Sequence, residues 1–444
     1  MSMPSKKRSG RPLPTARKPG AARQVGGGDR QGAGTSTQTR RAAKRAAGDN
    51  RRSASAGTAG RRAHSRDDGA RGQVDLGPNA RLIGQPRARE ALATPALVLD
   101  LAAFEHNVRT MSRLCKKAGL ALRPHAKTHK SVEVARRQIS AGAIGISVAT
   151  VREAAVMVEA GLPGVLLTTP VVGDIKLDIV SGLAARSKDF MVVVDTLAGV
   201  EALERGGRKL TVLVDIDIGM TRTGVPDVAG AVTLIRRVQA SKVLKLAGVQ
   251  AYSGMVQHIT LPADRERVYG AQLRHLEAVL KAASDELGYT PGIVTGGGTG
   301  SFEIDRRAGL FTECQCGSYV FMDVQYEGVQ LFSAAPNPFK TALFVQCTVV
   351  SNNHRTSPTT DGGFKTFSMD GPVPRLARGV SKGAVYQYFG DEFGKIPGEK
   401  LRLGAKVELV TPHCDPTVNM HDFYHCIRGS VLEDIWPVDA RGSL

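Results

Sequence analysis

The stretch LALRPHAKTHKSVEVARRQISAGAIGISVAT, residues 120–150, contains the pattern that decides the fold. Apolar runs over 120–127 and 144–150 flank an amphipathic segment over 129–141. A short strand, a helix and a second short strand in this order form a βαβ unit, in which the two strands are parallel. The stretch therefore predicts an α/β protein with a parallel sheet.

The same alternation continues along the chain. The predicted strands are 120–127, 144–150, 164–170, 190–195, 210–217, 246–253, 292–296 and 316–323, and helical segments fit between most of them, for example 129–141, 151–160, 228–240 and 265–287. Eight βα repeats over about 200 residues predict a (β/α)8 TIM barrel, which we place at 101–335. Catalytic groups of such barrels lie at the C-terminal ends of the strands.

Two regions of the body lie outside this count. Residues 94–100 form a predicted strand that precedes a helix over 101–118, in a leading segment that we place at 81–100. After about residue 336 the helical period disappears, and short predicted strands at 343–351, 407–411 and 431–438 are separated by Gly/Pro turns. This composition predicts a second, β-rich domain over 336–444.

Residues 1–80 differ in composition from the rest of the chain. They hold 18 Lys/Arg and 5 Asp/Glu, so they carry 13 of the 19 net positive charges and leave only +6 for the other 364 residues. With almost no large apolar residues, this segment predicts a disordered basic tail. Its Arg-Arg pairs suit polyanions, but no aromatic residues interleave to stack on bases, so nucleic-acid binding is not favoured. An organellar transit peptide and an early start codon remain alternatives.

Composition also limits the class of protein. No stretch approaches the roughly 18–20 uninterrupted apolar residues that a membrane span requires. The six cysteines include no CxxC pair and no spacing typical of a disulfide scaffold, which favours free thiols and a reducing compartment. These patterns predict an unsecreted, cytoplasmic protein with no membrane span.

The basic cluster Arg123–Lys130 follows the first predicted barrel strand. At this position Lys127 is expected to project into the mouth of the barrel. Neighbouring positive charge would lower the pKa of Lys127 and free its amine for Schiff-base formation. The alternative interpretation is a solvated basic loop.

A glycine-rich loop, Thr295–Ser301, follows another predicted strand. Consecutive glycines let backbone N–H groups approach a phosphate, although such a loop is also common as a tight turn. Together with an activated lysine on the same face of the barrel, the loop predicts pyridoxal phosphate as a cofactor.

The segment His413–Asp422 offers a metal site. If 407–415 is a strand, His413 and Asp415 point to the same side and Cys414 to the other. One imidazole and one carboxylate suit Mn²⁺, Mg²⁺ or Zn²⁺ when water and substrate oxygens complete the coordination. Structural hydrogen bonding is the alternative.

Four further residues are expected at the same mouth. Arg222, with Asp217, could orient the lysine or the substrate, Tyr252 could stack on a flat ring, and His258 could transfer a proton. A structural Asp–Arg pair, a packed Tyr and a surface His are the alternatives.

Taken together, these stretches resemble the D-threonine aldolase / D-serine dehydratase family of fold-type III pyridoxal phosphate enzymes, relatives of alanine racemase. The motifs that carry the resemblance are TPALVLD at 94–100, RPHAKTHK at 123–130, GGGTG at 296–300, QCGSYVFMD at 315–323 and the run 413–422. The resemblance implies a Schiff base on Lys127, phosphate at Gly296–Gly300 and a divalent metal on His413 and Asp415. It also implies that strand 94–100 joins the C-terminal domain, and that the active site lies between domains, often across a homodimer.

Within the family, dehydratases typically carry His-x-Cys at the metal pair and aldolases His-x-Asp, the latter suited to Mn²⁺ or Mg²⁺ more than to Zn²⁺. Asp415 therefore predicts retro-aldol cleavage of a β-hydroxy-D-amino acid, of the D-threonine or 3-hydroxy-D-aspartate type, to glycine and an aldehyde. Phe393 and Gly362 depart from the family pattern and leave the substrate open. The alternatives are β-elimination of D-serine or 3-hydroxyaspartate to a keto acid and ammonia, a non-catalytic cofactor carrier, and a polyanion-binding protein.

The predicted site is thus as follows. The catalytic residues are Lys127, His129 and His258; the cofactor contacts are Lys127, Arg222, Tyr252, Gly296, Gly297, Gly298, Thr299, Gly300, Gln315, Gly317, Ser318 and Tyr319; and the metal ligands are His413 and Asp415.

Overall fold

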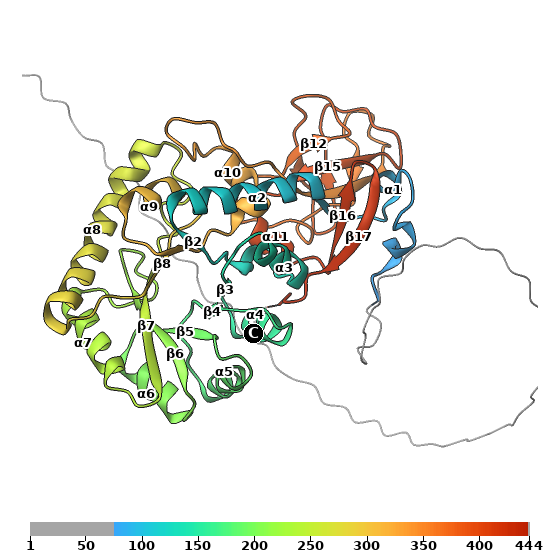
Figure 1. Ribbon diagram of the computed structural model, residues 1–444. Helices are drawn as coiled ribbons and strands as arrows, with labels where there is room; N and C mark the ends of the chain where they lie inside the picture. Colours follow the sequence, from blue (N-terminus) through green and yellow to red (C-terminus); the bar gives the residue numbers. More distant parts are fainter. Residues whose placement is uncertain (1–74, 443–444) are drawn as a thin grey trace, which may run out of the picture. The chain divides into compact units, whose positions relative to one another are not determined.

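Eight parallel strands form a ring in the computed structural model, which describes residues 75–442 (Figure 1). The strands are β2 (Ala121–Leu122), β3 (Ile146–Val148), β4 (Val165–Leu167), β5 (Met191–Val194), β6 (Leu210–Ile216), β7 (Leu244–Ala251), β8 (Ile293–Gly296) and β9 (Glu313–Cys314). Consecutive strands from β3 to β9 pair in order, and β9 pairs with β2. A parallel bridge between His125 and Ser147 closes the ring. The predicted TIM barrel is confirmed.

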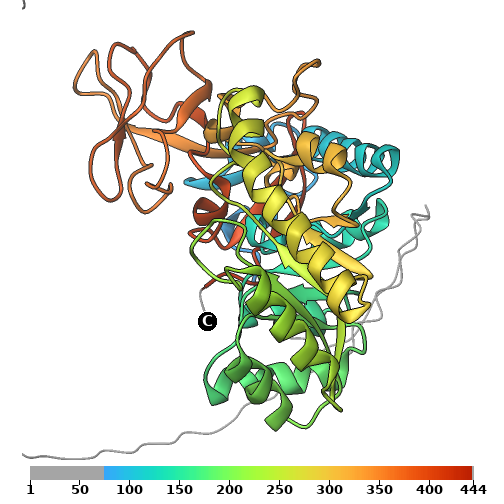
Figure 2. The same cartoon turned by 90° about the vertical axis from the view of Figure 1, so that its left-hand side faces the viewer.

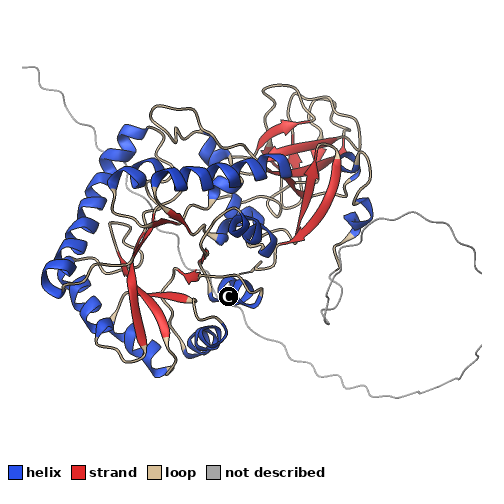
Figure 3. Ribbon diagram, viewed as in Figure 1, coloured by secondary structure: helices blue, strands red, loops and turns tan. Residues whose placement is uncertain are grey.

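Helices surround this ring, as Figure 3 shows in blue around the red strands. They are α2 (Leu101–Ala118), α3 (Val132–Ser140), α4 (Val151–Glu159), α5 (Asp174–Arg186), α6 (Leu197–Arg205), α7 (Val228–Gln239), α8 (Pro262–Leu287) and α9 (Phe302–Ala308). Figure 2 shows α7 and α8 side by side on the outside of the barrel. Thr150, Thr196 and Asp227 begin three of the helices because each side chain accepts a hydrogen bond from an amide in the first turn.

Alternation of side chains along the strands separates two apolar layers. Val192 and Val194 of β5 pack in a cluster with residues of the outer helices. Met191 and Val193 instead join Leu213 and neighbouring residues in a small separate cluster inside the ring. Burial on both faces explains why the strand segments are almost continuously apolar.

The eighth predicted strand, 316–323, is wrong. The strand is β9, and the segment after it contains the 3₁₀ helix η3 (Ser318–Val320) and a left-handed residue, Met322. Tyr319, Val320 and Phe321 are fully buried in the apolar cluster that also contains residues of the β-rich domain. The apolar pattern of this segment therefore reflects burial between two domains rather than a strand.

The β-rich domain is built around β1 (Ala96–Asp100), which lies ahead of the barrel in the sequence. This strand pairs antiparallel with β10 (Leu343–Ser351) and parallel with β16 (Phe423–Arg428). The other strands are β11 (Thr359–Thr360), β12 (Arg375–Arg378), β13 (Gln387–Tyr388), β14 (Gly394–Lys395), β15 (Lys406–Val410) and β17 (Val431–Pro437). The predicted insertion of strand 94–100 into the C-terminal domain is confirmed.

Short helices complete the described chain: η1 (Pro78–Leu82), α1 (Ala88–Ala91), η2 (Ala126–Thr128), α10 (Val324–Glu327) and α11 (Cys414–Val418). Most of the predicted tail lies outside the described residues, but its last part does not continue the expected disorder. Asn79 is 4% exposed, because its Nδ2 donates to the Ala93 carbonyl at 3.0 Å and its Oδ1 accepts from the Ala93 amide. Within residues 75–442, no helix combines the length and the apolarity that crossing a bilayer requires. All six cysteines are free, as predicted, and the structure shows that all six are buried.

Candidate active site

The basic cluster after β2 is not a solvated loop. Arg123 is 4% exposed, and its guanidinium forms two hydrogen bonds of 2.7 and 2.9 Å with the Glu313 carboxylate of β9. Lys130 is buried beside Glu153, with 3.0 Å between Nζ and Oε1. Arg123 and Lys130 thus each have a buried carboxylate as a partner, whereas Lys127 extends into the mouth of the barrel.

Lys127 forms an ion pair with Asp415, which lies 288 residues further along the chain. The side chains are 39% and 13% exposed. Burial lowers the pKa of the Lys127 ammonium, but the Asp415 carboxylate and Tyr252 more than reverse this effect, so the net pKa is raised. Lys127 also holds the pKa of Asp415 below its usual value, against the opposite effect of burial.

The predicted lowering of the Lys127 pKa is therefore wrong for this structure. The neighbouring cations that were expected to lower it are neutralised by Glu313 and Glu153, and the nearest charge is a carboxylate. Lys127 is protonated in this state and becomes a nucleophile only when the proton is transferred away.

The segment around His413 and Asp415 is not a strand throughout, contrary to the prediction. Strand β15 ends at Val410, and Asp415 lies in the first turn of α11. Pro412, which lacks an N–H, interrupts the ladder between them. The helical turn nevertheless brings His413 Nε2 within 4.0 Å of Asp415 Oδ1. Cys414 is fully buried with its Sγ 3.5 Å from Thr411 Oγ1, so it faces away from the pair as predicted.

The donor chemistry of His413 and Asp415 fits a divalent cation. His413 Nδ1 lies 2.7 Å from Asp370 Oδ2, and donation to this carboxylate leaves the Nε2 lone pair available beside Asp415. Asp415 Oδ1 is buried and has no hydrogen-bond partner in the described residues. Within residues 75–442, no group of three or more His, Cys, Asp and Glu side chains is placed to hold a metal. The pair would therefore provide part of a coordination sphere that water and substrate oxygens complete.

A cavity of about 410 Å³ opens beside Lys127 at the C-terminal end of the barrel. Its lining includes His125, Lys127, Thr168, Arg222, Tyr252 and Gln315. The Arg222 guanidinium lies 5.6 Å from the centre of the Tyr252 ring. Ser253 follows Tyr252, is fully buried, and has an Oγ without a hydrogen-bond partner in the described residues. An amine, an aromatic face, a cation and an unpaired hydroxyl suit a flat anionic aldehyde such as pyridoxal phosphate.

The glycine-rich loop after β8 is buried, and its residues are not among those lining this cavity. Gly298 N donates to Ser301 Oγ at 3.0 Å and Gly300 N to Gln257 Oε1 at 2.9 Å. Thr299 Oγ1 accepts from Tyr319 N. The glycines also permit close packing, since a Cβ on Gly296 would lie 1.8 Å from the Ala251 carbonyl oxygen. Protein groups thus occupy two of the loop amides that were predicted to hold phosphate.

The 315–319 segment divides its residues between the cavity and the core. Gln315 lines the cavity, and its Nε2 donates to Thr295 Oγ1 at 3.1 Å. Gly317 and Ser318 are half-buried, and a Cβ on Gly317 would lie 2.7 Å from Thr128 Oγ1. The side chain of Tyr319 is fully buried, and its OH accepts from Gln138 Nε2, so it lies in the core and not in the cavity.

The two predicted proton carriers occupy different environments. His129 is fully buried, and its Nδ1 accepts from the Ser131 amide at 3.1 Å; burial lowers its pKa to about 4. The His258 ring packs edge-on against Tyr326 at 4.7 Å. Its pKa is lowered by burial and then by the charge of His413. The lowered pKa favours the neutral imidazole, which is the form that accepts a proton.

His125, Thr168 and Ser253 were not singled out from the sequence, and none of them carries a permanent charge. His125 lines the cavity beside Lys127, and its Nε2 lies 3.2 Å from Thr168 Oγ1. Burial and, after it, the charge of Lys127 lower the pKa of His125 to about 3. His125 lies in the basic motif that drew attention to Lys127, so its position two residues earlier was a usable signal. Thr168 and Ser253 had no such signal.

Comparisons with known proteins agree with this architecture. Residues 99–325 match the alanine racemase N-terminal domain, and residues 342–427 match a serine dehydratase domain. The chain is 38% identical to D-threonine aldolase of an Arthrobacter species, covering 81% of this chain and 95% of that protein. It is 34% identical to 3-hydroxy-D-aspartate aldolase of Paracoccus denitrificans (strain Pd 1222), covering 79% and 92%. The crystal structure of D-threonine aldolase from Filomicrobium marinum superposes with a TM-score of 0.75 at 37% identity, covering 80% and 96%.

Proposed function

Since this chain belongs to the D-threonine aldolase / D-serine dehydratase family, with an alanine racemase N-terminal domain as its barrel, we propose that it cleaves a β-hydroxy-D-amino acid to glycine and an aldehyde. It is a pyridoxal phosphate-dependent lyase of the aldolase kind. The observation that carries the proposal is the meeting of Lys127 with Asp415 and His413 at the mouth of the barrel. Lys127 supplies an amine, and His413 and Asp415 supply donors suited to a metal. These groups lie close together, which fits the aldolase activity for which two relatives are named.

The cavity would hold pyridoxal phosphate through Lys127, with its ring near Tyr252. This cofactor supplies an aldehyde that condenses with amines and a ring that accepts electrons from the bond being broken. Arg222 lines the cavity and offers a cation to an anionic group. We propose that Gly296–Gly300, Gln315, Gly317, Ser318 and Tyr319 also lie close to the cofactor, although the amides of Gly298, Gly300 and Tyr319 already donate to Ser301, Gln257 and Thr299.

His413 and Asp415 would hold the divalent ion, which we propose to be Mn²⁺ or Mg²⁺ and less readily Zn²⁺. A divalent cation polarises the oxygen that it binds and so favours loss of its proton. One nitrogen and one carboxylate oxygen, with no thiolate, favour the harder ions, because Cys414 points into the core. Asp370 would fix the ring of His413.

Two steps depend on proton carriers of the chain itself. Asp415 positions the Lys127 amine through their ion pair, and its carboxylate raises the pKa of Lys127. Burial and the charges of His413 and Lys127 lower the pKa of His258, which favours the neutral imidazole that accepts a proton at a ring nitrogen. We assign His129 to holding the loop, because it is enclosed and its carbonyl accepts from Tyr424 OH at 2.6 Å.

The test measures products with D-threonine and 3-hydroxy-D-aspartate, with and without Mn²⁺, in the enzyme loaded with pyridoxal phosphate. Glycine and an aldehyde in equal amounts support the proposal. If the products are ammonia and a keto acid, the reaction is β-elimination instead. If activity in EDTA equals activity with Mn²⁺, the reaction does not depend on a metal.

We further propose a homodimer in the cytoplasm. Met369, Val385, Phe389 and Phe393 of the β-rich domain are 45–59% exposed, an unusual set of large apolar side chains for one domain surface. A second copy of the chain would cover them. Light scattering after size-exclusion chromatography distinguishes a dimer from a monomer, and fractionation of cells tests the compartment.

A further inference from the structure

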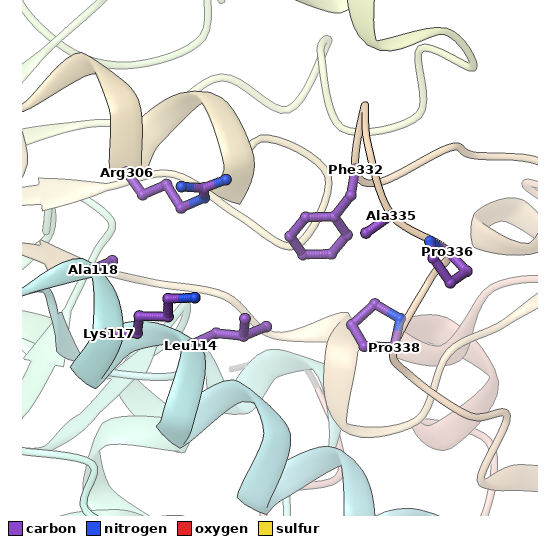
Figure 4. Close-up of a pocket in the computed structure, with 8 residues that line it drawn as sticks. All are labelled: Leu114, Lys117, Ala118, Arg306, Phe332, Ala335, Pro336 and Pro338. Atoms are coloured by element: carbon purple, nitrogen blue, oxygen red, sulfur yellow. The ribbon is translucent and has the colours of Figure 1, made fainter.

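A second cavity, of about 360 Å³, lies away from Lys127 and shares no lining residue with the cavity beside it. It is formed by the C-terminal end of α2, by α9 and by the segment 332–338 (Figure 4). Neither the proposed reaction nor the predicted site uses any of these residues. The volume is at the lower end of the range for small-molecule sites, so an occupant would be small.

One end of this pocket is cationic. Lys117 of α2 and Arg306 of α9 extend their charged groups toward the same space in Figure 4. Lys117 makes no ion pair with any residue in 75–442. Arg306 Nη2 lies 3.6 Å from Glu303 Oε1, but that carboxylate also accepts hydrogen bonds from the Ser333 amide and hydroxyl. The pocket is therefore lined by two cations, and the one carboxylate near Arg306 is already engaged by Ser333, which leaves a positive excess at this end.

The rest of the pocket is apolar. Leu114 of α2 and the Phe332 ring lie on either side of the space, and Pro336 and Pro338 form the end opposite the cations (Figure 4). Proline has no N–H group, and its ring fixes φ, so this end offers hydrocarbon on a stiff backbone. Phe332 is 8% exposed, so its ring is held in place by packing.

These two ends together define the chemistry of the occupant. An inorganic anion would pair with the cations but leave the apolar end filled with water, and a neutral hydrocarbon would leave the cations without a partner. A carboxylate with an apolar body satisfies both ends. We propose that the pocket between α2, α9 and residues 332–338 binds a small aromatic or branched aliphatic carboxylate.

The test uses isothermal titration of the full chain, loaded with pyridoxal phosphate, with three probes. 3-Phenylpropanoate carries both features, 3-phenylpropanamide has the same shape without the charge, and acetate has the charge without the body. We expect 3-phenylpropanoate to bind with a Kd of about 1 mM or lower, and each of the other probes to bind about tenfold more weakly or worse. Equal binding of the acid and the amide overturns the proposal.

Variants locate the site. Lys117→Gln and Arg306→Gln should each weaken 3-phenylpropanoate binding about tenfold, because each removes a charge-assisted contact. Lys117 is exposed and forms no ion pair with any residue in 75–442, so its variant should fold normally. Lys188→Gln makes the same change of charge at an exposed loop position and should bind as the unaltered chain does. Binding that survives both pocket variants, or that falls equally with Lys188→Gln, overturns the assignment.

Discussion

Lys127 Nζ and Asp415 Oδ2 form an ion pair that joins the first strand–helix connection of the barrel to the first turn of α11 in the β-rich domain. The proposed cofactor amine and the proposed metal ligand therefore lie within ion-pair distance of one another, so that one site draws on both domains.

Replacement of Lys127 by Ala should remove covalent attachment of pyridoxal phosphate and lower activity by about a thousandfold or more, because no other amine lines the cavity. Borohydride reduction followed by mass spectrometry of the peptides locates the attachment. Lys116→Ala, at an exposed position of α2, is the matched control and should keep both the attached cofactor and the activity. A reduced cofactor found on the Lys127→Ala chain would contradict the assignment.

The barrel and the amine were predictable because their signals are local. The strand and the helix of each βα unit can be predicted from about 30 consecutive residues. The cations around Lys127 stand out because burial disfavours charged side chains at the end of a barrel strand. The direction of the Lys127 pKa was not predictable. It depends on Asp415, and on the neutralisation of Arg123 and Lys130 by carboxylates far away in the sequence or across the barrel.

The same distinction explains the two strands that were misplaced. Residues 316–323 are apolar because they pack between domains, and 411–415 alternate without extending β15, since Pro412 ends the ladder. Periodicity reports burial, and burial arises at domain contacts as well as in sheets. The Gly296–Gly300 loop shows a similar limit: its composition indicates close approach of the backbone, and the close neighbours turn out to be Ala251, Gln257 and Asp305.

Stability should fall as pH decreases from about 6.5 to about 4. The pKa of His129 is about 4 in the folded chain, against about 6.5 when unfolded, so the unfolded chain takes up the proton first. The contribution is complete above pH 6.5 and is lost as pH falls toward 4, by roughly 2–3 kcal/mol at pH 4.5. Urea unfolding at about pH 6.5 and about pH 4.5 measures this loss of unfolding free energy. His129→Asn should flatten this dependence, whereas the exposed His354→Asn should not; equal slopes in both variants would count against burial of a neutral His129.

Arg123 and Glu313 should behave as a buried pair. Their side chains are 5% and 3% exposed, so Arg123→Met alone leaves a carboxylate buried without its partner and should cost about 3–5 kcal/mol of unfolding free energy. Glu313→Leu added to this variant removes that charge, so the double variant should be more stable than Arg123→Met. Urea unfolding compares the three chains. A double variant no more stable than the single one would show that lost packing, and not an unpaired charge, sets the cost.

Asp370 should act on the metal through His413. It is 53% exposed and touches neither the cavity beside Lys127 nor Asp415, but its Oδ2 lies 2.7 Å from His413 Nδ1 and so fixes both the tautomer and the ring. Asp370→Ala should weaken Mn²⁺ binding about 10–100-fold while leaving pyridoxal phosphate attached. Titration of the loaded enzyme with Mn²⁺, followed by electron paramagnetic resonance, measures the affinity. Asp391→Ala, which removes an exposed carboxylate of the same domain paired with Lys365, should leave it unchanged. If Asp370→Ala binds Mn²⁺ as tightly as this control, the hydrogen bond does not position the ligand, and the Nε2 lone pair of His413 must be directed by packing alone.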